Sequence, residues 1–163
     1  METKSPSLYP EMEDKLLALM DEFHLLNPAR DRWQVLIQSF SETSLRQIDS
    51  AAPELPLVQL VSGSATSGEV RAGAAEVATY AEGLGPSHSD VDAGVIEGAH
   101  QSCLAVHPYT VNDVDDTVRL IEIGVDGMFT NFPDKLNDVL GDRAVHGKRA
   151  AVLAKRAHDV CVA

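Results

Sequence analysis

Residues 104–112 read Leu-Ala-Val-His-Pro-Tyr-Thr-Val-Asn, and they join a strand pattern to a helix pattern. The first six residues are mostly apolar, as in a strand of a parallel sheet. Asn112 has a side chain that suits the N-terminal cap of a helix. Apolar residues then recur at helical spacing, in Val114, Val118 and Ile121, and Gly124 ends the expected helix. The stretch therefore predicts one unit of a strand followed by a helix.

The same order of strand and helix repeats along the sequence. We predict strands at residues 1–4, 34–39, 57–61, 81–86, 104–109 and 125–130. Helices are predicted to begin at Pro10, at Ser41, after the loop of residues 62–68, at Ser89-Asp90, at Asn112 and at Pro133. Such alternation with short connections requires a mostly parallel sheet with helices on its outside.

Two architectures satisfy this alternation: an open doubly wound sheet and a (β/α) barrel. Neither a G-x-G-x-x-G motif nor a G-x-x-x-x-G-K-[ST] motif follows any of the predicted strands. Their absence removes the strongest argument for an open sheet that binds a nucleotide. The order of strands and helices by itself leaves the choice between the two architectures open.

The composition excludes several classes of function. The chain of 163 residues is 44% hydrophobic, enough for one domain with a core. Its formal net charge of -12 argues against binding nucleic acid or an anionic membrane through a broad basic surface. No run of about 18 apolar residues is present, so we expect no transmembrane segment. The N-terminus shows no signal peptide, which taken literally indicates the cytoplasm, although the export signal of a longer parent would precede Met1.

The two cysteines, Cys103 and Cys161, lie far apart and match no metal-binding spacing. We expect free buried thiols rather than a disulfide. The chain ends in a predicted helical tail that contains a basic run at residues 147–156. We interpret this run as a solvated helix face.

Four motifs, in this order, resemble the glycerophosphodiester phosphodiesterase family. They are Glu2-Thr3-Lys4, Ile-Gln-Ser-Phe at residues 37–40, residues 99–112 from Ala-His to Thr-Val-Asn, and Gly-Val-Asp-Gly-Met-Phe-Thr-Asn-Phe-Pro at residues 124–133. The resemblance covers about residues 1–140 as a partial phosphodiesterase domain and leaves 141–163 as a C-terminal helical tail. It implies an incomplete (β/α)₈ TIM-type barrel of about six βα units with parallel strands, similar to strands three to eight of the family's barrel. The active site of such a barrel lies at the carboxyl ends of the strands.

The resemblance also implies a reaction, the hydrolysis of a small-molecule glycerophosphodiester to an alcohol and sn-glycerol 3-phosphate with Ca²⁺ or Mg²⁺. In this family the glutamate of a hydrophobic-Glu-x-Lys strand ligates the cation and the lysine contacts the substrate phosphate. Glu2 and Lys4 fall on these positions, and residues two apart on a strand point to the same side. Gln38 is then expected to be a polar pocket contact, and Tyr109 an aromatic wall where the family usually has tryptophan.

The family's catalytic histidine pair has no counterpart in this sequence. The family carries His-Arg-Gly on its first strand and an acid with a second histidine on its next strand, and no His-Arg-Gly occurs here. We therefore assign no catalytic residue, and we expect a divalent cation to bind weakly or not at all to this chain alone. We interpret His100 and His107 as structural, Asn112 as a helix cap and Asn131 as a turn or cap residue.

Two alternatives to a fragment of an active enzyme stay open. One is a catalytically inactive, truncated remnant. The other is a partial-barrel module that needs a partner chain, because six parallel strands cannot close an eight-stranded barrel and leave the first and last strands with unpaired backbone groups. From these open edges we predict self-association of the chain.

Overall fold

The computed structural model describes residues 1–26, 35–63 and 66–144. Four strands form one parallel sheet in the order β1 (Ile37–Ser39), β2 (Leu57–Leu60), β3 (Gly83–Gly85) and β4 (Ala105–Val106). The helices are α1 (Met12–Glu22), α3 (Glu42–Ala51), α4 (Ser67–Val77), α5 (Ala93–His100), α6 (Val114–Ile123) and α7 (Pro133–Ala144), with 3₁₀ turns η1 (Pro6–Leu8) and η2 (His88–Asp90). None of the helices among the described residues is long and apolar enough to cross a membrane.

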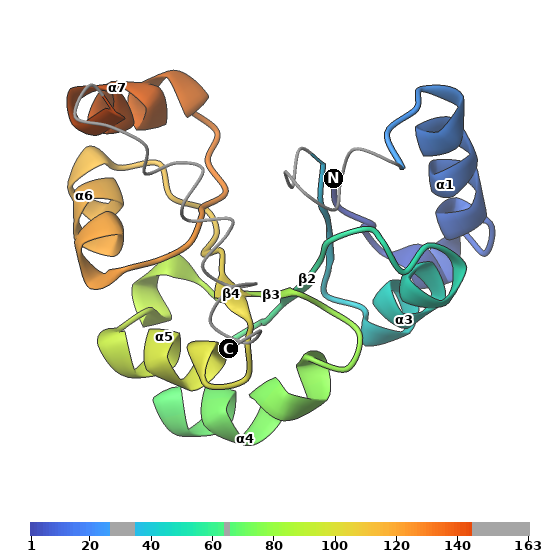
Figure 1. The fold of residues 1–163 in the computed structure, drawn as a ribbon, viewed down its shortest axis with the longest axis horizontal. Helices are drawn as coiled ribbons and strands as arrows, with labels where there is room; N and C mark the ends of the chain where they lie inside the picture. The colour runs from blue at the N-terminus through green and yellow to red at the C-terminus, as the bar shows by residue number, and fades with distance from the viewer. Residues whose placement is uncertain (27–34, 64–65, 145–163) are drawn as a thin grey trace.

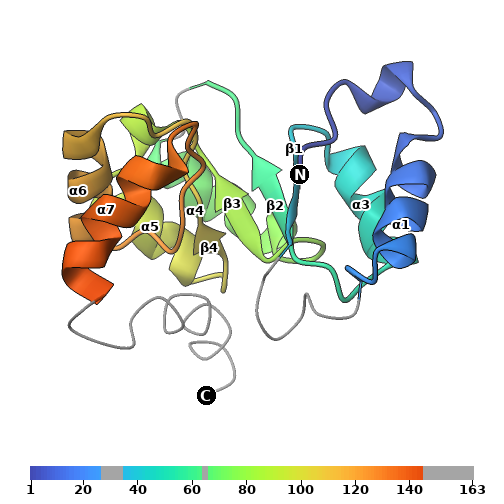
Figure 2. The same ribbon diagram turned by 90° about the horizontal axis from the view of Figure 1, so that it is seen from above.

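The helices follow one another around one side of the sheet in an open arc (Figure 1). Seen from above, α1 and α3 lie at one end of the molecule, and α6 and α7 lie at the other (Figure 2). This is the α/β architecture of parallel strands with outer helices that the alternation predicted, and the sheet is open rather than closed into a barrel. The prediction of an incomplete barrel is thus confirmed.

The first and last predicted strands are present as short extensions of the sheet rather than as regular strands. At the N-terminus, Glu2 forms a single parallel bridge with Gln38 of β1. At the other end, residues 125–129 run beside β4 and the loop after it. There Asp126 N donates to Val106 O at 3.1 Å and Phe129 N donates to Pro108 O at 2.9 Å. All six predicted strand segments therefore lie in order, but only the middle four form a regular sheet.

The core lies between the sheet and the helices in two clusters of buried apolar residues. One cluster packs α1 and α3 against β1 and β2, and it includes Met20, Leu45 and Ile48. The second packs α4, α5 and α6 against β3 and β4, and it includes Val95 and Leu120. Because side chains alternate along a strand, these strands direct every second residue to the helices and the others to the opposite side of the sheet.

Capping side chains explain where several helices begin. The Ser41 side chain accepts from Ser44 N and starts α3, as predicted. Thr66 and Glu69 form a reciprocal capping box at the start of α4, which the sequence analysis treated as part of a loop. The predicted caps of the next two helices are wrong by one to three residues, because Asp92 caps α5 and Asp113 caps α6.

The expectation of a free, buried thiol at Cys103 is also wrong. Cys103 is exposed in the turn between α5 and β4, and it takes part in a disulfide. Its φ of +66° lies in the left-handed region that favours glycine. Residues 141–144 of the predicted tail form the end of α7, and the rest of the tail, with its basic run and Cys161, lies outside the described residues.

Candidate functional site

A pocket of about 290 Å³ opens at the carboxyl ends of the strands. Its lining comes from the N-terminal segment, the ends of β1 and β2, the loop after β4 and the segment before α7. The lining residues are Glu2, Gln38, Phe40, Leu60, Tyr109, Thr110, Phe129, Thr130 and Asn131. This is the edge at which parallel α/β folds place their ligand sites. Three of the four residues predicted to bind metal or substrate, Glu2, Gln38 and Tyr109, meet in this pocket.

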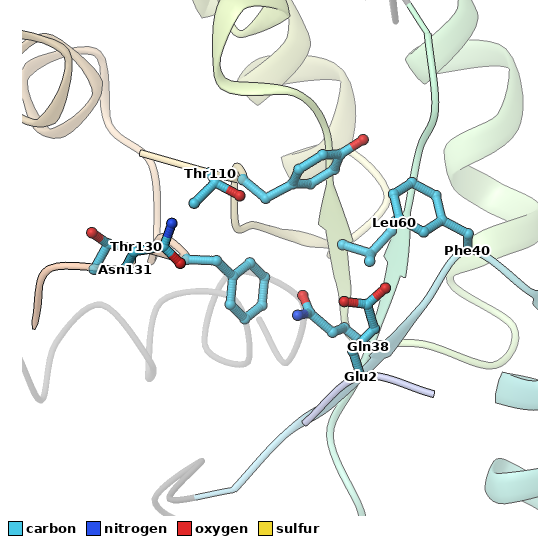
Figure 3. Close-up of a pocket in the computed structure, with 9 residues that line it drawn as sticks. Glu2, Gln38, Phe40, Leu60, Thr110, Thr130 and Asn131 are labelled. Atoms are coloured by element: carbon cyan, nitrogen blue, oxygen red, sulfur yellow. The ribbon is translucent and has the colours of Figure 1, made fainter. Parts of the chain in front are cut away.

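Strand alternation brings Glu2 and Gln38 together. Thr3 N donates to Gln38 O at 3.1 Å, and Gln38 N donates to Met1 O at 2.8 Å, so the two segments pair in register. Thr3 and Ile37 are buried toward the helices, and their neighbours Glu2 and Gln38 therefore face the pocket. Figure 3 shows the two side chains next to each other at one side of the pocket.

The Gln38 amide oxygen is buried in this setting and has no hydrogen-bond partner among the described residues. A buried acceptor without a donor costs roughly 1–3 kcal/mol of stability. Buried polar atoms in native proteins are nearly always paired, and the exceptions concentrate where a ligand or water binds. Gln38 Oε1 is therefore set to accept a hydrogen bond from a bound molecule or to coordinate a cation.

Tyr109 and Phe40 form an aromatic wall of the pocket. Their rings meet edge to face, with centroids 5.5 Å apart and an interplanar angle of 84°. The Tyr109 hydroxyl donates to Val61 O at 2.7 Å, which holds the ring across the end of β2. Burial, and after it the negative charges of Asp90 and Glu2, raise the pKa of Tyr109, so the phenol stays neutral and keeps this hydrogen bond.

Thr130 and Asn131 form a second wall, which lies across the pocket from Phe40 and Leu60 in Figure 3. Thr110 and Phe129 also line the pocket. Asn112 holds this wall in place, because its side-chain oxygen accepts from Asn131 N at 3.0 Å. Thr110 and Thr130 were not predicted as pocket residues. A signal was available, since Thr110 directly follows the predicted strand 104–109 and Thr130 is the last residue of the predicted strand 125–130.

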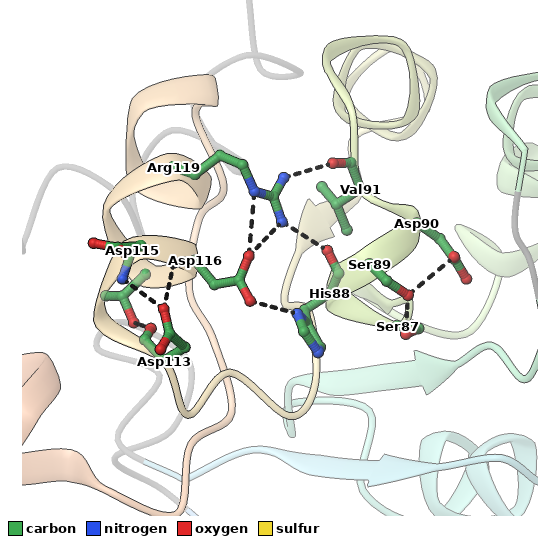
Figure 4. Close-up of polar contacts among 10 residues, drawn as sticks. Ser87, His88, Ser89, Asp90, Val91, Asp113, Asp115, Asp116 and Arg119 are labelled. Carbon is green, nitrogen blue, oxygen red and sulfur yellow. Dashed lines mark hydrogen bonds and ion pairs between the residues drawn. The ribbon is translucent and has the colours of Figure 1, made fainter.

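The loop between β3 and α5 pairs with the backbone of Tyr109. Figure 4 shows this loop and its contacts with Arg119 of α6. Ser87 bridges to Tyr109, and His88 N donates to Tyr109 O at 2.8 Å. Arg119 on α6 fastens this loop, since its guanidinium donates to His88 O at 3.1 Å and to Val91 O at 3.2 Å. The same guanidinium contacts Asp116 at 3.2 Å, so a charge pair on α6 keeps it in place.

Lys4, the fourth predicted residue, is exposed and is not among the residues that line the pocket. It follows Glu2 by two residues and lies beyond the single bridge that pairs Glu2 with Gln38. Its contact with a phosphate stays a prediction.

The Glu2 carboxylate and Gln38 Oε1 are two neighbouring oxygen donors that could contact a hard cation. Both are of the type that Ca²⁺ and Mg²⁺ prefer, but these ions take about six to eight oxygens. No group of three or more His, Cys, Asp or Glu side chains that could hold a metal occurs among the described residues. The pocket residues described here therefore do not make up a cation site by themselves.

His107 and His100 both lie away from the pocket lining. His107 is 8% exposed, and its ring lies against Phe129 with centroids 6.0 Å apart. A Cβ on Gly127 would come within 3.0 Å of its Nε2, so glycine is needed there. Burial lowers the pKa of His107 to about 4, and Asp126 opposes this only in part. His100 Nε2 is instead 2.8 Å from Asp126 Oδ2.

Known proteins match the chain along most of its length. The model of the glycerophosphoryl diester phosphodiesterase family matches residues 1–135. A glycerophosphodiester phosphodiesterase of Bacillus subtilis is 40% identical over 139 residues, which are 85% of this chain and 47% of the relative. One from Caldanaerobacter subterraneus is 30% identical over 129 residues, 79% of this chain and 49% of the relative. The chain thus spans about half the length of the curated relatives it matches.

Solved structures share the fold. A glycerophosphodiester phosphodiesterase from Parabacteroides distasonis superposes with a TM-score of 0.65 at 15% identity, over 88% of this chain and 56% of that one. An Oleispira antarctica phosphodiesterase, solved in complex with the product sn-glycerol-3-phosphate, superposes with a TM-score of 0.57 at 21% identity, over 65% of this chain and 41% of that one. With four ordered motifs, a matching fold and a family model that covers residues 1–135, the chain belongs to the glycerophosphoryl diester phosphodiesterase family.

Proposed function

We propose that this chain is the C-terminal part of an enzyme that hydrolyses glycerophosphodiesters to an alcohol and sn-glycerol 3-phosphate, with a divalent cation required by the whole enzyme. The observation that carries the proposal is the pocket at the carboxyl ends of the strands, where Glu2 and the unpaired oxygen of Gln38 lie side by side. Family membership supports the reaction, and the product bound to the Oleispira antarctica relative supports the substrate class.

The pocket residues have chemistry that suits such a substrate. The hydroxyls of Thr110 and Thr130 and the Asn131 side chain offer donors and acceptors for glycerol hydroxyls and phosphate oxygens. Phe40 and Tyr109 form an apolar wall that limits water and fixes the orientation of the bound diester. Lys4 would add a positive charge near the phosphate, and Glu2 would be one of several ligands of the cation.

Proton transfer is the part of the reaction that the described residues do not provide. Hydrolysis forms a bond from an attacking oxygen to phosphorus, breaks the bond to the alcohol, and returns a proton to that alcohol. A general acid or base needs reach to these atoms before its pKa matters. His107 is buried away from the pocket lining and is held neutral, and His100 is bound to Asp126. We therefore propose that this chain binds and positions the substrate, and we assign proton transfer to none of its described residues.

The experiment that tests the proposal starts from the native protein. Its intact mass and N-terminal sequence are measured after purification from its source, and the same sample is assayed for release of sn-glycerol 3-phosphate with Ca²⁺ or Mg²⁺. We expect a species with a His-Arg-Gly strand ahead of Glu2 that releases the product. A species that begins at Met1 and releases no product from any diester tried would contradict the proposal and favour an inactive remnant or a module that needs a partner chain.

A further inference from the structure

Three buried polar side chains form a continuous hydrogen-bonded chain on the helix side of the N-terminal segment. Thr3 is 3% exposed, Ser44 in α3 is 2% exposed and Glu13 in α1 is 4% exposed. The hydroxyls of Thr3 and Ser44 lie 2.9 Å apart, and the Ser44 hydroxyl donates to Glu13 Oε1. The Thr3–Ser44–Glu13 chain thus joins three segments that are far apart in the sequence.

The carboxylate sets the direction of every hydrogen bond in this chain. A carboxylate only accepts, and a hydroxyl has one proton to donate. Because Ser44 donates its proton to Glu13, Thr3 must donate its own proton to Ser44. The Thr3 hydroxyl is therefore held in one orientation, with its side chain directed at the helices.

Holding Thr3 in this way also holds Glu2. Neighbouring residues on a strand point to opposite sides, so fixing Thr3 toward α3 fixes Glu2 toward the pocket. The backbone of Thr3 is held as well, because Ser39 Oγ donates to Thr3 O at 3.0 Å. Among the described residues, β1 pairs with one edge of residues 1–3 and no strand pairs with the other edge, so the contacts of Thr3 with α3 add to a single line of backbone hydrogen bonds.

Burial of the Glu13 carboxylate costs free energy of folding, which its hydrogen bond to Ser44 offsets in part. Glutamate is almost never fully buried without a partner, and the neighbouring core cluster of α1 and α3 is apolar. The carboxylate also lies beside Ser44 in the first turn of α3, where the positive end of the helix dipole favours a negative charge. An apolar side chain would pack α1 against α3, but it would leave the Thr3 hydroxyl without a fixed direction.

From this geometry we propose that Glu13 is a positioning residue, which acts through Ser44 and Thr3 to hold the Glu2 carboxylate in the pocket. The proposal rests on the proposed function, since it takes Glu2 as a ligand-binding group. The proposal predicts that the position of Glu2 in the pocket depends on Glu13, a residue of α1 that is not among the residues lining the pocket.

The first test needs no ligand and measures amide hydrogen exchange by NMR in the full chain. Thr3→Val removes the hydroxyl and keeps the shape, and Glu13→Gln removes the charge that sets the bond directions. We expect Thr3 N–H, which donates to Gln38 O, to exchange about five- to tenfold faster in both variants, relative to the Val106 amide. The matched controls are Thr43→Val and Asp14→Asn, which change exposed residues next to Ser44 and Glu13 in the sequence. Both should leave the exchange of the Thr3 amide unchanged. Equal acceleration at Thr3 and Val106 would overturn the proposal.

The second test separates positioning from simple stabilisation. Affinity for sn-glycerol 3-phosphate is measured by calorimetry with Ca²⁺ present, for Thr3→Val in the natural background and in a Glu2→Gln background. We expect about a fivefold loss of affinity in the natural background and no further loss in the Glu2→Gln background, because the effect passes through the carboxylate. Equal losses in both backgrounds would show a merely structural role and overturn the proposal.

The two tests also separate this proposal from the proposed function. If the unaltered chain does not bind the probe, the failure counts against the proposed function, and the exchange experiment still decides whether Glu13 holds the N-terminal segment.

Discussion

At the scale of single residues, two glutamines on neighbouring strands show how the side of the sheet decides a role. Gln59 faces the helices and is fully paired: its amide nitrogen donates to three carbonyls, and its oxygen accepts from the Tyr80 hydroxyl at 3.0 Å. Gln38 faces the pocket, and its oxygen is unpaired among the described residues. The same side chain is thus fully hydrogen-bonded inside the core in one strand and has an unpaired oxygen beside the pocket in the other.

This contrast predicts opposite effects of the same substitution. Gln38→Met removes an unsatisfied acceptor, so we expect the free energy of unfolding to stay the same or rise by up to about 1 kcal/mol. Gln59→Met leaves the Tyr80 hydroxyl and several carbonyls without a partner and should cost about 2 kcal/mol. Urea unfolding of the two variants measures both values. Equal losses would contradict the assignment of Gln38 to ligand binding.

A second prediction at this scale concerns the cation. Glu2 and Gln38 are too few ligands to hold Ca²⁺ or Mg²⁺ tightly, so we expect millimolar concentrations of either ion to leave the thermal midpoint of this chain unchanged. Only an ion that binds the native state would raise it. Differential scanning calorimetry with and without the ion makes the comparison. An upward shift that Glu2→Gln abolishes would prove the site more complete than the described residues indicate.

His107 predicts a dependence of stability on pH. Its folded pKa of about 4 lies below the ordinary 6.5, so between these values the unfolded chain binds more protons than the folded chain. Stability therefore falls as the pH drops from 6.5 to 4, by up to about 3 kcal/mol from this residue. His107→Gln should flatten the free energy of unfolding across this window. Contributions of other groups, such as Glu82, whose pKa burial raises, are common to both proteins and cancel in the difference. If the free energy of unfolding of the variant falls with pH as steeply as that of the unaltered protein, the His107 ring is not buried in its neutral form.

At the scale of elements, the start of α6 shows how one residue divides structure from function. Asp113, not Asn112, caps the helix, because Asp113 Oδ1 accepts from Asp115 N at 2.8 Å. Asn112 does not cap the helix, and its side-chain oxygen instead accepts from Asn131 N in the pocket wall. Two adjacent polar residues with similar capping preference therefore act on different parts of the molecule.

We expect Asp113→Ala to lower the free energy of unfolding by about 1 kcal/mol, the usual value of an N-cap. Asn112→Ala should cost less overall and should mainly speed the exchange of the Asn131 amide, whose acceptor it removes. Urea unfolding combined with amide exchange distinguishes the two effects. If Asn112→Ala destabilises the chain as much as Asp113→Ala and leaves Asn131 exchange unchanged, the division of roles is wrong.

At the scale of the whole molecule, the open sheet predicts association. The pairing of Gln38 with Met1 O and Thr3 N directs the N–H and C=O of Glu2 away from β1. Among the described residues no strand pairs with that outer edge. Unpaired strand edges invite pairing with another chain.

We therefore expect the mass of the chain, measured by size-exclusion chromatography with light scattering, to rise with concentration. Glu2→Pro removes the outward N–H and keeps the pairing with Gln38, so it should reduce the rise. A sharp monomer peak at every concentration would rule out association through this edge.

Local patterns in the sequence were enough to establish the order of strands and helices, the parallel sheet and the family. Strand periodicity and the turn residues are short-range properties, and the motifs at residues 37–40, 99–112 and 124–133 carry the family signal in adjacent residues. The resemblance singled out Glu2, Gln38 and Tyr109 as metal or substrate contacts. The structure brings these three together in one pocket.

The tertiary structure alone decided which polar residues work together. Thr3, Glu13 and Ser44 meet only because α1 and α3 pack side by side against the first segments of the sheet. Thr110 and Thr130 share a pocket because two strand ends lie next to each other. Asn112 reaches Asn131 because the loop after β4 and the segment before α7 lie side by side. Each of these contacts joins residues distant in the chain, and local propensity contains no information about them, because it acts only between near neighbours in the sequence.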